Sequence, residues 1–252
     1  MTELENQNLI NKEFCYQVDS LQNPQEMLFH LFKRFKNRAA IVTSGQLSGM
    51  VLVHMAFENG LPFRVCTIDT LRLFPEVYEF FEIVEARYNL RIERIQPHAQ
   101  TIKSMVAEHG EYLFFDSKKK QEYCCHVRKV EPMQRLMNTL DVWFSGLRRD
   151  QSESRQHVPK AEIHEHNGRC VLKVNPLADW TADRVWEFIN QNDIPVNSLL
   201  KPQDNGHYYE SLGCIICTTP IMPGEPKRAG RWRWQNATSS ENTKECGLHY
   251  AI

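Results

Sequence analysis

Four of the eight cysteines in this 252-residue chain form two close pairs that are far apart in sequence. Cys124 and Cys125 are adjacent, and Cys214 and Cys217 are separated by only two residues. Thiolates grouped in this way are ligands for zinc, for iron–sulfur clusters and for other soft metal centres. The spacing therefore predicts one metal or redox centre built from both pairs.

Three kinds of centre fit the four thiols to different degrees. Adjacent ligands are awkward for one tetrahedral zinc ion, which makes a structural zinc site less favoured. A redox disulfide between Cys214 and Cys217 would normally follow a thioredoxin-like strand, whereas here the pair follows a glycine- and proline-rich stretch. An iron–sulfur cluster can share neighbouring thiolates among several irons. The pattern favours the cluster, with zinc and the redox disulfide as alternatives.

A fifth cysteine, Cys246, lies near the C-terminus after a polar stretch, 236–244, that we predict to be a flexible link. Thiolates are the nucleophilic form of cysteine, and His249 and the upstream arginines favour this form of Cys246, while Glu245 disfavours it. We therefore expect a sulfur nucleophile in the tail. The three remaining cysteines stand alone in the sequence and are predicted to be unreactive small residues: Cys15, Cys66 and Cys170.

Charge and length restrict the possible partners. The net charge is -1, from 30 basic and 31 acidic residues, so no overall field attracts nucleic acid or an anionic membrane. Two local basic groups, within 118–155 and 227–233, can instead surround a compact polyanion such as phosphate or sulfate. The chain can fold around its own core without disulfides, and we expect a cytoplasmic protein without a secretion signal or membrane span.

Alternating strand and helix patterns predict an α/β fold with a mostly parallel sheet. The expected strands are 39–43, 63–68, 91–95, 141–145 and 171–174. The expected helices are 48–59, 75–89, 122–138 and 182–191, and the third of these places Cys124 and Cys125 near a helix start. A polar segment, 150–168, interrupts the pattern, and 193–234 is predicted to consist mainly of loops.

The turn 43–49, TSGQLSG, lies between a predicted strand and a predicted helix. Small residues there allow backbone amides and the positive end of the helix to face an anion. The turn lacks the Gly-Lys-Ser/Thr ending of a P-loop, so on its own it indicates a phosphate site only weakly.

Six segments together resemble one known family, the assimilatory adenylylsulfate and phosphoadenylylsulfate reductases. The resemblance extends from about Ala39 to His249 and rests on these blocks in family order: 68–76 (IDTLRLFPE), 124–129 (CCHVRK), 146–152 (GLRRDQS), 213–218 (GCIICT), 228–232 (RAGRW) and 245–249 (ECGLH).

The resemblance implies a doubly wound α/β fold of the pyrophosphate-loop, adenine nucleotide alpha-hydrolase-like type. It implies an N-terminal helical region (1–38), a nucleotide-binding reductase domain (39–234) and a flexible tail (235–252). It also implies a 4Fe-4S cluster on Cys124, Cys125, Cys214 and Cys217. Cys246 would attack the sulfate sulfur, and thioredoxin or glutaredoxin would then release sulfite.

Further residues receive roles only from the resemblance. Lys129 and His249 match catalytic positions, Lys129 between cluster and substrate and His249 after the nucleophile. The positions that match the family's substrate-binding residues are Ser44, Gly45, Arg72, Arg155, Arg228 and Arg231. Leu71 differs from the family pattern, which has glycine there, and turn 43–49 lacks the acidic pair common among adenylylsulfate-preferring relatives.

These observations lead us to expect thioredoxin-dependent reduction of adenylyl sulfate (APS) to sulfite and AMP, for sulfate assimilation and cysteine biosynthesis, in a homo-oligomer. APS is favoured because cluster-bearing relatives prefer it. The alternatives are reduction of the 3'-phosphorylated substrate (PAPS) or of both, an ATP-using alpha-hydrolase, and a zinc-stabilised binding module.

Overall fold

The computed structural model of the chain describes residues 10–234. The predicted tail residues Cys246 and His249 and the predicted flexibility of 235–252 therefore lie outside the described residues. The chain divides into two compact units. We call the first the sheet unit (Met1–Thr67, Glu79–Glu93 and Met137–Asn197) and the second the cysteine unit (Ile68–Tyr78, Arg94–Leu136 and Ser198–Ile252). The domain boundaries at 38/39 and 234/235 stay a prediction.

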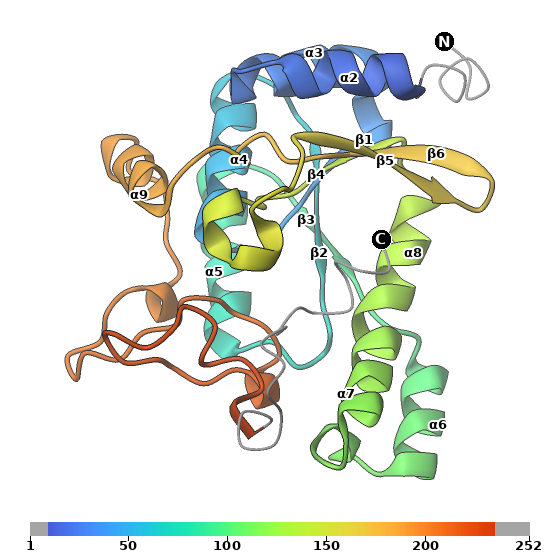
Figure 1. Ribbon diagram of the computed structural model, residues 1–252, viewed down its shortest axis with the longest axis vertical. Coiled ribbons are helices and arrows are strands. Elements are labelled where there is room, and N and C mark those ends of the chain that lie inside the picture. Colours follow the sequence, from blue (N-terminus) through green and yellow to red (C-terminus); the bar gives the residue numbers. More distant parts are fainter. Residues whose placement is uncertain (1–9, 235–252) are drawn as a thin grey trace. The chain divides into compact units, whose positions relative to one another are not determined.

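Six strands form one sheet in the order β3-β2-β1-β4-β6-β5 (Figure 1). Their bounds are β1 Ala39–Val42, β2 Arg64–Ile68, β3 Ile92–Ile95, β4 Val142–Phe144, β5 Ala161–His166 and β6 Arg169–Val174. Strand β1 pairs in parallel with β2 and with β4, and β4 pairs in parallel with β6. The predicted α/β class with a mostly parallel sheet is confirmed.

The central strands are buried on both faces, which explains their uninterrupted apolar sequences. Strand β1 reads AAIV and β4 reads VWF, and every residue of β4 is buried. Fully covered parallel strands favour such continuous runs over alternation. Strand β1 lies between β2 and β4, and the strand order continues from these two strands toward opposite edges of the sheet. Such a reversal of strand order is a topological switch point, and open α/β sheets bind ligands at the carboxyl ends of the strands there.

The helices begin where the sequence supplies capping groups. The Asn11 side chain accepts a hydrogen bond from the Phe14 N–H, and Thr181 accepts one from the Arg184 N–H. Asn23 caps a helix whose first residue is Pro24. The helices that begin or lie in the sheet unit are α2 Lys12–Ser20, α3 Pro24–Phe35, α4 Leu47–Glu58 and α9 Ala182–Gln191; α5, Pro75–Tyr88, begins in the cysteine unit and continues into the sheet unit.

Strand β5 is absent from the sequence prediction, which treated 150–168 as a polar interruption. It pairs antiparallel with β6 at the edge of the sheet, with Ile163 opposite Leu172. Of its six residues only Ala161 is buried. An edge strand with one exposed face needs little apolar surface, so its composition resembles that of a loop.

The predicted helix 122–138 is confirmed as one uninterrupted helical run, but this run begins at Lys118 instead of Glu122, and its middle part is a π-helix. The structure has α7 Lys118–Cys125, a π-helical stretch His126–Val130 and α8 Glu131–Met137. Ser117 caps α7 by accepting a hydrogen bond from the Lys120 N–H at 3.2 Å. The adjacent cysteines therefore end α7, instead of starting a helix, and a π-helical segment follows them.

The cysteine unit contains α7, the helix α6 (Ala99–His109), which the sequence did not predict, and short 3-10 turns. Two of these turns, Ser198–Leu200 and Ile215–Cys217, lie in the stretch 198–234, which otherwise carries isolated bridges such as Tyr208 to Ile221. The predicted loop character of 193–234 is confirmed. Within residues 10–234 no helix is both long and apolar enough to cross a bilayer.

Candidate cysteine centre and anion loop

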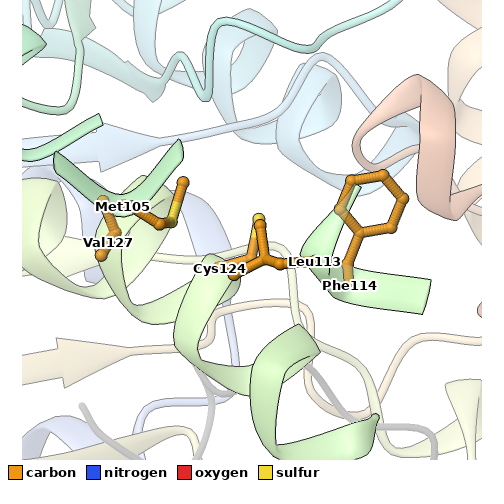
Figure 2. Packing of buried hydrophobic residues seen from close by; sticks show 5 residues of the cluster. All are labelled: Met105, Leu113, Phe114, Cys124 and Val127. Carbon is orange, nitrogen blue, oxygen red and sulfur yellow. The ribbon is translucent and has the colours of Figure 1, made fainter. Parts of the chain in front are cut away.

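The four paired cysteines all lie in the cysteine unit and are buried, with 5% to 7% of each residue exposed. Cys124 packs in an apolar cluster with Leu113 and Val127, and Figure 2 shows this packing. Cys214 and Cys217 form a second cluster with Trp232. Ile216 and Trp234 pack against both clusters, so the two distant pairs come together as predicted.

Helix geometry gives each adjacent cysteine a hydrogen-bonding neighbour one turn away. Gln121 Nε2 lies 3.2 Å from Cys125 Sγ and donates to it, four residues earlier in α7. Arg128 follows Cys124 by four residues and its side chain hydrogen-bonds that thiol. Residues four apart share a helix face. The π-helical stretch contains Arg128, and such bulges are frequent at functional sites.

Burial disfavours the anionic form of Cys217 and of Cys124. It raises the pKa of Cys217 to about 12, and the neighbouring Cys214 adds to this effect, while Lys129 and Arg231 oppose it. Burial also raises the pKa of Cys124, against the attraction of Arg128. A bound metal centre supplies the positive charge that deprotonates coordinating thiols. The site therefore suits metal ligation better than free thiolate chemistry.

Several buried nitrogen donors around these cysteines have no hydrogen-bond partner within the described part of the chain. They are Arg72 Nη1, Arg128 Nε, Arg231 Nε and Trp232 Nε1. A buried donor without a partner costs about 1–3 kcal/mol. All four groups can donate and none can accept, so together they favour an anionic occupant such as cluster sulfide or a sulfate oxygen.

Arg231 is 5% exposed, and its Nη1 donates to Thr218 Oγ1 at 3.1 Å. The guanidinium also lies over the Trp232 ring, with 4.8 Å from its central carbon to the ring centroid. A Cβ atom on Gly213 would lie 1.9 Å from Arg231 Nη1, so only glycine leaves room there. Gly213 therefore fixes the place of this arginine next to Cys214.

The donor set fits a cluster better than one metal ion. Among residues 10–234 no three Cys, His, Asp or Glu side chains converge tightly enough to hold a single ion. A 4Fe-4S cluster is wider than one ion, and its four thiolates each bind a different iron, so their sulfurs surround the centre at larger separations. The described cysteines are also unpaired by disulfides, so all four thiols are available.

The sheet unit holds a second candidate site, at the carboxyl ends of β1 and β4, which we call the anion loop (43–49 with 145–151) after the function predicted for it. Gly45 has φ +73°, and its N–H donates to Thr43 Oγ1 at 3.1 Å. A Cβ on Gly146 would lie 2.8 Å from the Gly49 nitrogen, so the two segments pass in close contact. The anion loop leads directly into α4, whose N-terminus carries a partial positive charge.

Arg148 connects the two segments of the anion loop. It is 6% exposed, and its Nη1 donates to Ser48 Oγ at 2.5 Å while Nε donates to Asp150 Oδ1 at 2.9 Å. Both partners belong to the protein, so Arg148 holds the loop in shape. The sequence analysis did not assign this residue a role, although it lies inside one of the family-like blocks.

The predicted site residues divide between the units. Ser44, Gly45 and Arg155 lie in the sheet unit, where Ser44 is exposed and Arg155 Nη1 donates to Gln151 Oε1 at 2.6 Å. The others lie with the cysteines: Arg72, Lys129, Arg228 and Arg231. Arg72 Nη2 pairs with Glu111 Oε1 at 3.0 Å, and the Arg228 carbonyl accepts from the Arg231 N–H at 3.0 Å. Their individual roles stay predictions.

Sequence reasoning missed Gln121 and Arg128 as members of the site. Their spacing of four residues from Cys125 and Cys124 was a usable signal. It required knowing that the helix begins at Lys118, before the cysteines, because only then does Gln121 share a face with Cys125.

Comparison with known proteins gives a consistent result. The family model described as phosphoadenosine phosphosulfate reductase domain matches residues 38–220. A relative from Allochromatium vinosum named adenosine 5'-phosphosulfate reductase is 42% identical over 207 residues, which cover 82% of this chain and 77% of the relative.

Solved structures agree on the fold. A phosphoadenylyl-sulfate reductase from Candida auris, a phosphate complex, has a TM-score of 0.67 and 26% identity, and the match covers 84% of this chain and 98% of that one. The Candida glabrata FMN adenylyltransferase with FMN and an ATP analogue has a TM-score of 0.53 and 14% identity, over 90% of this chain and 75% of that one. The second likeness concerns the fold alone and confirms the adenine nucleotide alpha-hydrolase-like type.

Proposed function

Because the chain belongs to the phosphoadenosine phosphosulfate reductase family, we propose that it reduces adenylyl sulfate to sulfite and AMP. The predicted family and enzyme class are confirmed. The observation that carries the proposal is the buried set of four cysteines surrounded by unpartnered cationic and indole donors. An adenylating alpha-hydrolase of the same fold would have no use for such a set.

The cysteines suggest the cofactor. Cys124, Cys125, Cys214 and Cys217 would hold a 4Fe-4S cluster, supported by their burial, their free thiols and the surplus of donors. When bound, the cluster would fix the cysteine-bearing segments around one inorganic centre and set the local field through its own charge. Lys129, which already acts electrostatically on Cys217, would balance part of that charge.

The reaction itself would use Cys246, which lies outside the described residues. Its thiolate would attack the sulfate sulfur, forming an S–S bond while the bond from sulfur to the bridging oxygen breaks. The electron pair would leave with AMP, giving a cysteine S-sulfonate. A dithiol protein would then attack Cys246 Sγ, sulfite would depart with the S–S electron pair, and the dithiol would become a disulfide.

The cations of the cysteine unit would stabilise the charge that develops on the sulfate oxygens. Arg231 is suited to this role because burial and Gly213 hold it in one place. A preorganised donor of this kind contributes about a hundredfold or more to the rate. Lys129 and Arg228 would act in the same way, and His249 would lie near the nucleophile.

The anion loop would bind the nucleotide. The Gly45 region and the N-terminus of α4 suit a phosphate group, with the Ser44 hydroxyl as an exposed donor. Arg155 would assist from 145–155, although the structure pairs it with Gln151. The 42% identity to an adenosine 5'-phosphosulfate reductase supports adenylyl sulfate over its 3'-phosphorylated form.

Covalent trapping tests the proposal. We expect iron-replete protein, incubated anaerobically with adenylyl sulfate and no thiol, to gain one sulfonate on Cys246, as measured by intact mass and peptide mapping. Cys246→Ser should retain iron and sulfide but form neither the adduct nor sulfite. Sulfite formation by Cys246→Ser at the normal rate would overturn the mechanism. If the adduct formed only with the 3'-phosphorylated nucleotide, that nucleotide would be the substrate instead of adenylyl sulfate.

The reductant and assembly complete the proposal. Thioredoxin or glutaredoxin would supply the two electrons. The test is to add each purified dithiol protein to the S-sulfonate form of the enzyme and to measure the release of sulfite. A homo-oligomer and a cytoplasmic location stay predictions, the latter supported by the absence of disulfides within residues 10–234.

A further inference from the structure

Gln121 is an unusual buried residue in a highly charged helix. Helix α7 reads KKKQEYCC, and the buried side chains in it are Gln121, Cys124 and Cys125. Gln121 is 6% exposed, and its Nε2 lies 3.2 Å from Cys125 Sγ. The amide therefore lies on the cysteine face of the helix, although its neighbours Lys119 and Glu122 are exposed.

Burying an amide is costly unless strong hydrogen bonds replace those to water. A neutral thiol is a weak acceptor, whereas a thiolate that ligates a metal is a much better one. The hydrogen bond from the Gln121 amide is therefore strongest when Cys125 is a metal-bound thiolate. Arg128 is the corresponding donor for the other adjacent cysteine: it lies four residues after Cys124 and hydrogen-bonds that thiol.

We propose that Gln121 is a positioning residue for the metal centre, whose amide N–H holds the Cys125 sulfur in its ligating form. The proposal rests on the 4Fe-4S cofactor proposed above. The two adjacent ligand sulfurs would then accept different hydrogen bonds, that of Cys125 from a neutral amide and that of Cys124 from a charged guanidinium. Hydrogen bonds to ligand sulfur alter the metal–sulfur bond and the reduction potential, and loss of such outer contacts typically lowers metal affinity 10- to 100-fold.

Gln121→Met tests this with little change in side-chain volume and no donor. We expect the reconstituted variant to lose iron to a chelator about tenfold faster than the wild type. Its resonance Raman Fe–S(Cys) stretch should rise in frequency, because the sulfur donates more charge to iron without the hydrogen bond. The matched control is Gln191→Met on α9, where Gln191 is exposed and bonds Glu187 Oε1 at 3.1 Å. This control should match the wild type in both measurements.

Gln121→Glu provides a second variant of nearly identical shape in case the methionine variant fails to fold. Its carboxylate places a negative charge beside the sulfur, so iron loss should be faster still. Unchanged Raman bands and iron-loss rates in either folded variant would overturn the inference while leaving the cofactor in place. Wild-type protein without iron and acid-labile sulfide would overturn the cofactor proposal itself, and the inference with it.

Discussion

The two units treat their buried arginines in opposite ways. In the sheet unit, Arg148 is 6% exposed and its Nε donates to Asp150 Oδ1 at 2.9 Å. In the cysteine unit, Arg128 and Arg231 are 4% and 5% exposed, yet what they face is thiols, a hydroxyl and a carbonyl. A carboxylate neutralises the buried arginine in the sheet unit, whereas within residues 10–234 neither Arg128 nor Arg231 forms an ion pair or hydrogen bond with a carboxylate.

This difference indicates where each unit obtains its stability. The sheet unit has parallel strands with fixed register and arginines that are paired within the chain, so its geometry follows from the sequence alone. Buried donors without a partner occur in both units within residues 10–234, but those of the cysteine unit, such as Arg128 Nε and Arg231 Nε, lie around the paired cysteines, in a region of short turns. Because unpartnered donors and buried cations are destabilising, we expect this unit to gain its final order from the anionic group that its cysteines hold.

The largest expected effect comes from removing one thiol of the centre. Cys217→Ser should abolish iron and sulfide binding and reduce sulfite formation to background. Hydrogen exchange should accelerate in 113–130 and 198–234, because these segments lose their common ligand, and stay slow in β1 and β4. Hydrogen-exchange mass spectrometry measures both regions in one experiment.

Cys66→Ala is the matched control, because Cys66 is also fully buried but lies in β2 of the sheet unit. Burial raises the pKa of its thiol to about 12, as it does for Cys217, but Cys66 has no second cysteine near it in the sequence with which to share a centre. The variant should keep its iron and lose only a small amount of stability. If Cys217→Ser loosened β1 and β4 as much as the loops, the proposed division of stability between the units would be wrong.

An intermediate effect should follow from adding one methyl group to each unit. Gly213→Ala would place Cβ 1.9 Å from Arg231 Nη1, and Gly49→Ala would place it 2.1 Å from Thr43 Oγ1. We expect Gly213→Ala to displace Arg231 and lower kcat about a hundredfold, with AMP affinity unchanged.

Gly49→Ala should distort the anion loop and weaken AMP binding. Steady-state kinetics and AMP calorimetry on both variants distinguish these effects, and identical profiles would contradict separate roles.

The comparison of units also explains what the sequence could predict. The strands at 39–42 and 142–144 were predictable because buried parallel strands are apolar along their whole length. The two cysteine pairs were predictable as one centre because chemistry requires convergent ligands. Strand β5 was not, because an edge strand pairs through its backbone and carries polar residues such as His164.

The cysteine unit was harder to predict because its order depends on distant contacts. The start of α7 depends on the Ser117 cap, and the run of lysines conceals the buried position of Gln121. Leu71 has φ +58°, a conformation that favours glycine, and it is 46% exposed. No local sequence pattern predicts a leucine there. The predicted nucleophile Cys246 was suggested by its neighbours in the sequence, whereas its attack on sulfate and the active-site role of His249 came only from family resemblance.

The smallest effect concerns pH and should be confined to the sheet unit. His54 is 7% exposed, and its Nδ1 lies 3.2 Å from the Tyr88 hydroxyl. Burial lowers the pKa of His54 from its ordinary 6.5; Glu58 and a hydrogen bond to the Asn192 side chain oppose this, and Arg87 adds to it. The imidazole should therefore stay neutral in the folded protein at a pH where the unfolded chain already binds a proton.

Stability should consequently be complete above about pH 6.5 and decrease as the pH falls below it, by at most about 1.4 kcal/mol per pH unit. His54→Gln should remove this component and flatten the dependence of Tm on pH between about 5 and 7.5. Iron retention by the cysteine unit should follow the same pH profile in both proteins. Parallel Tm curves for the variant and the wild type would show that another group causes the acid sensitivity.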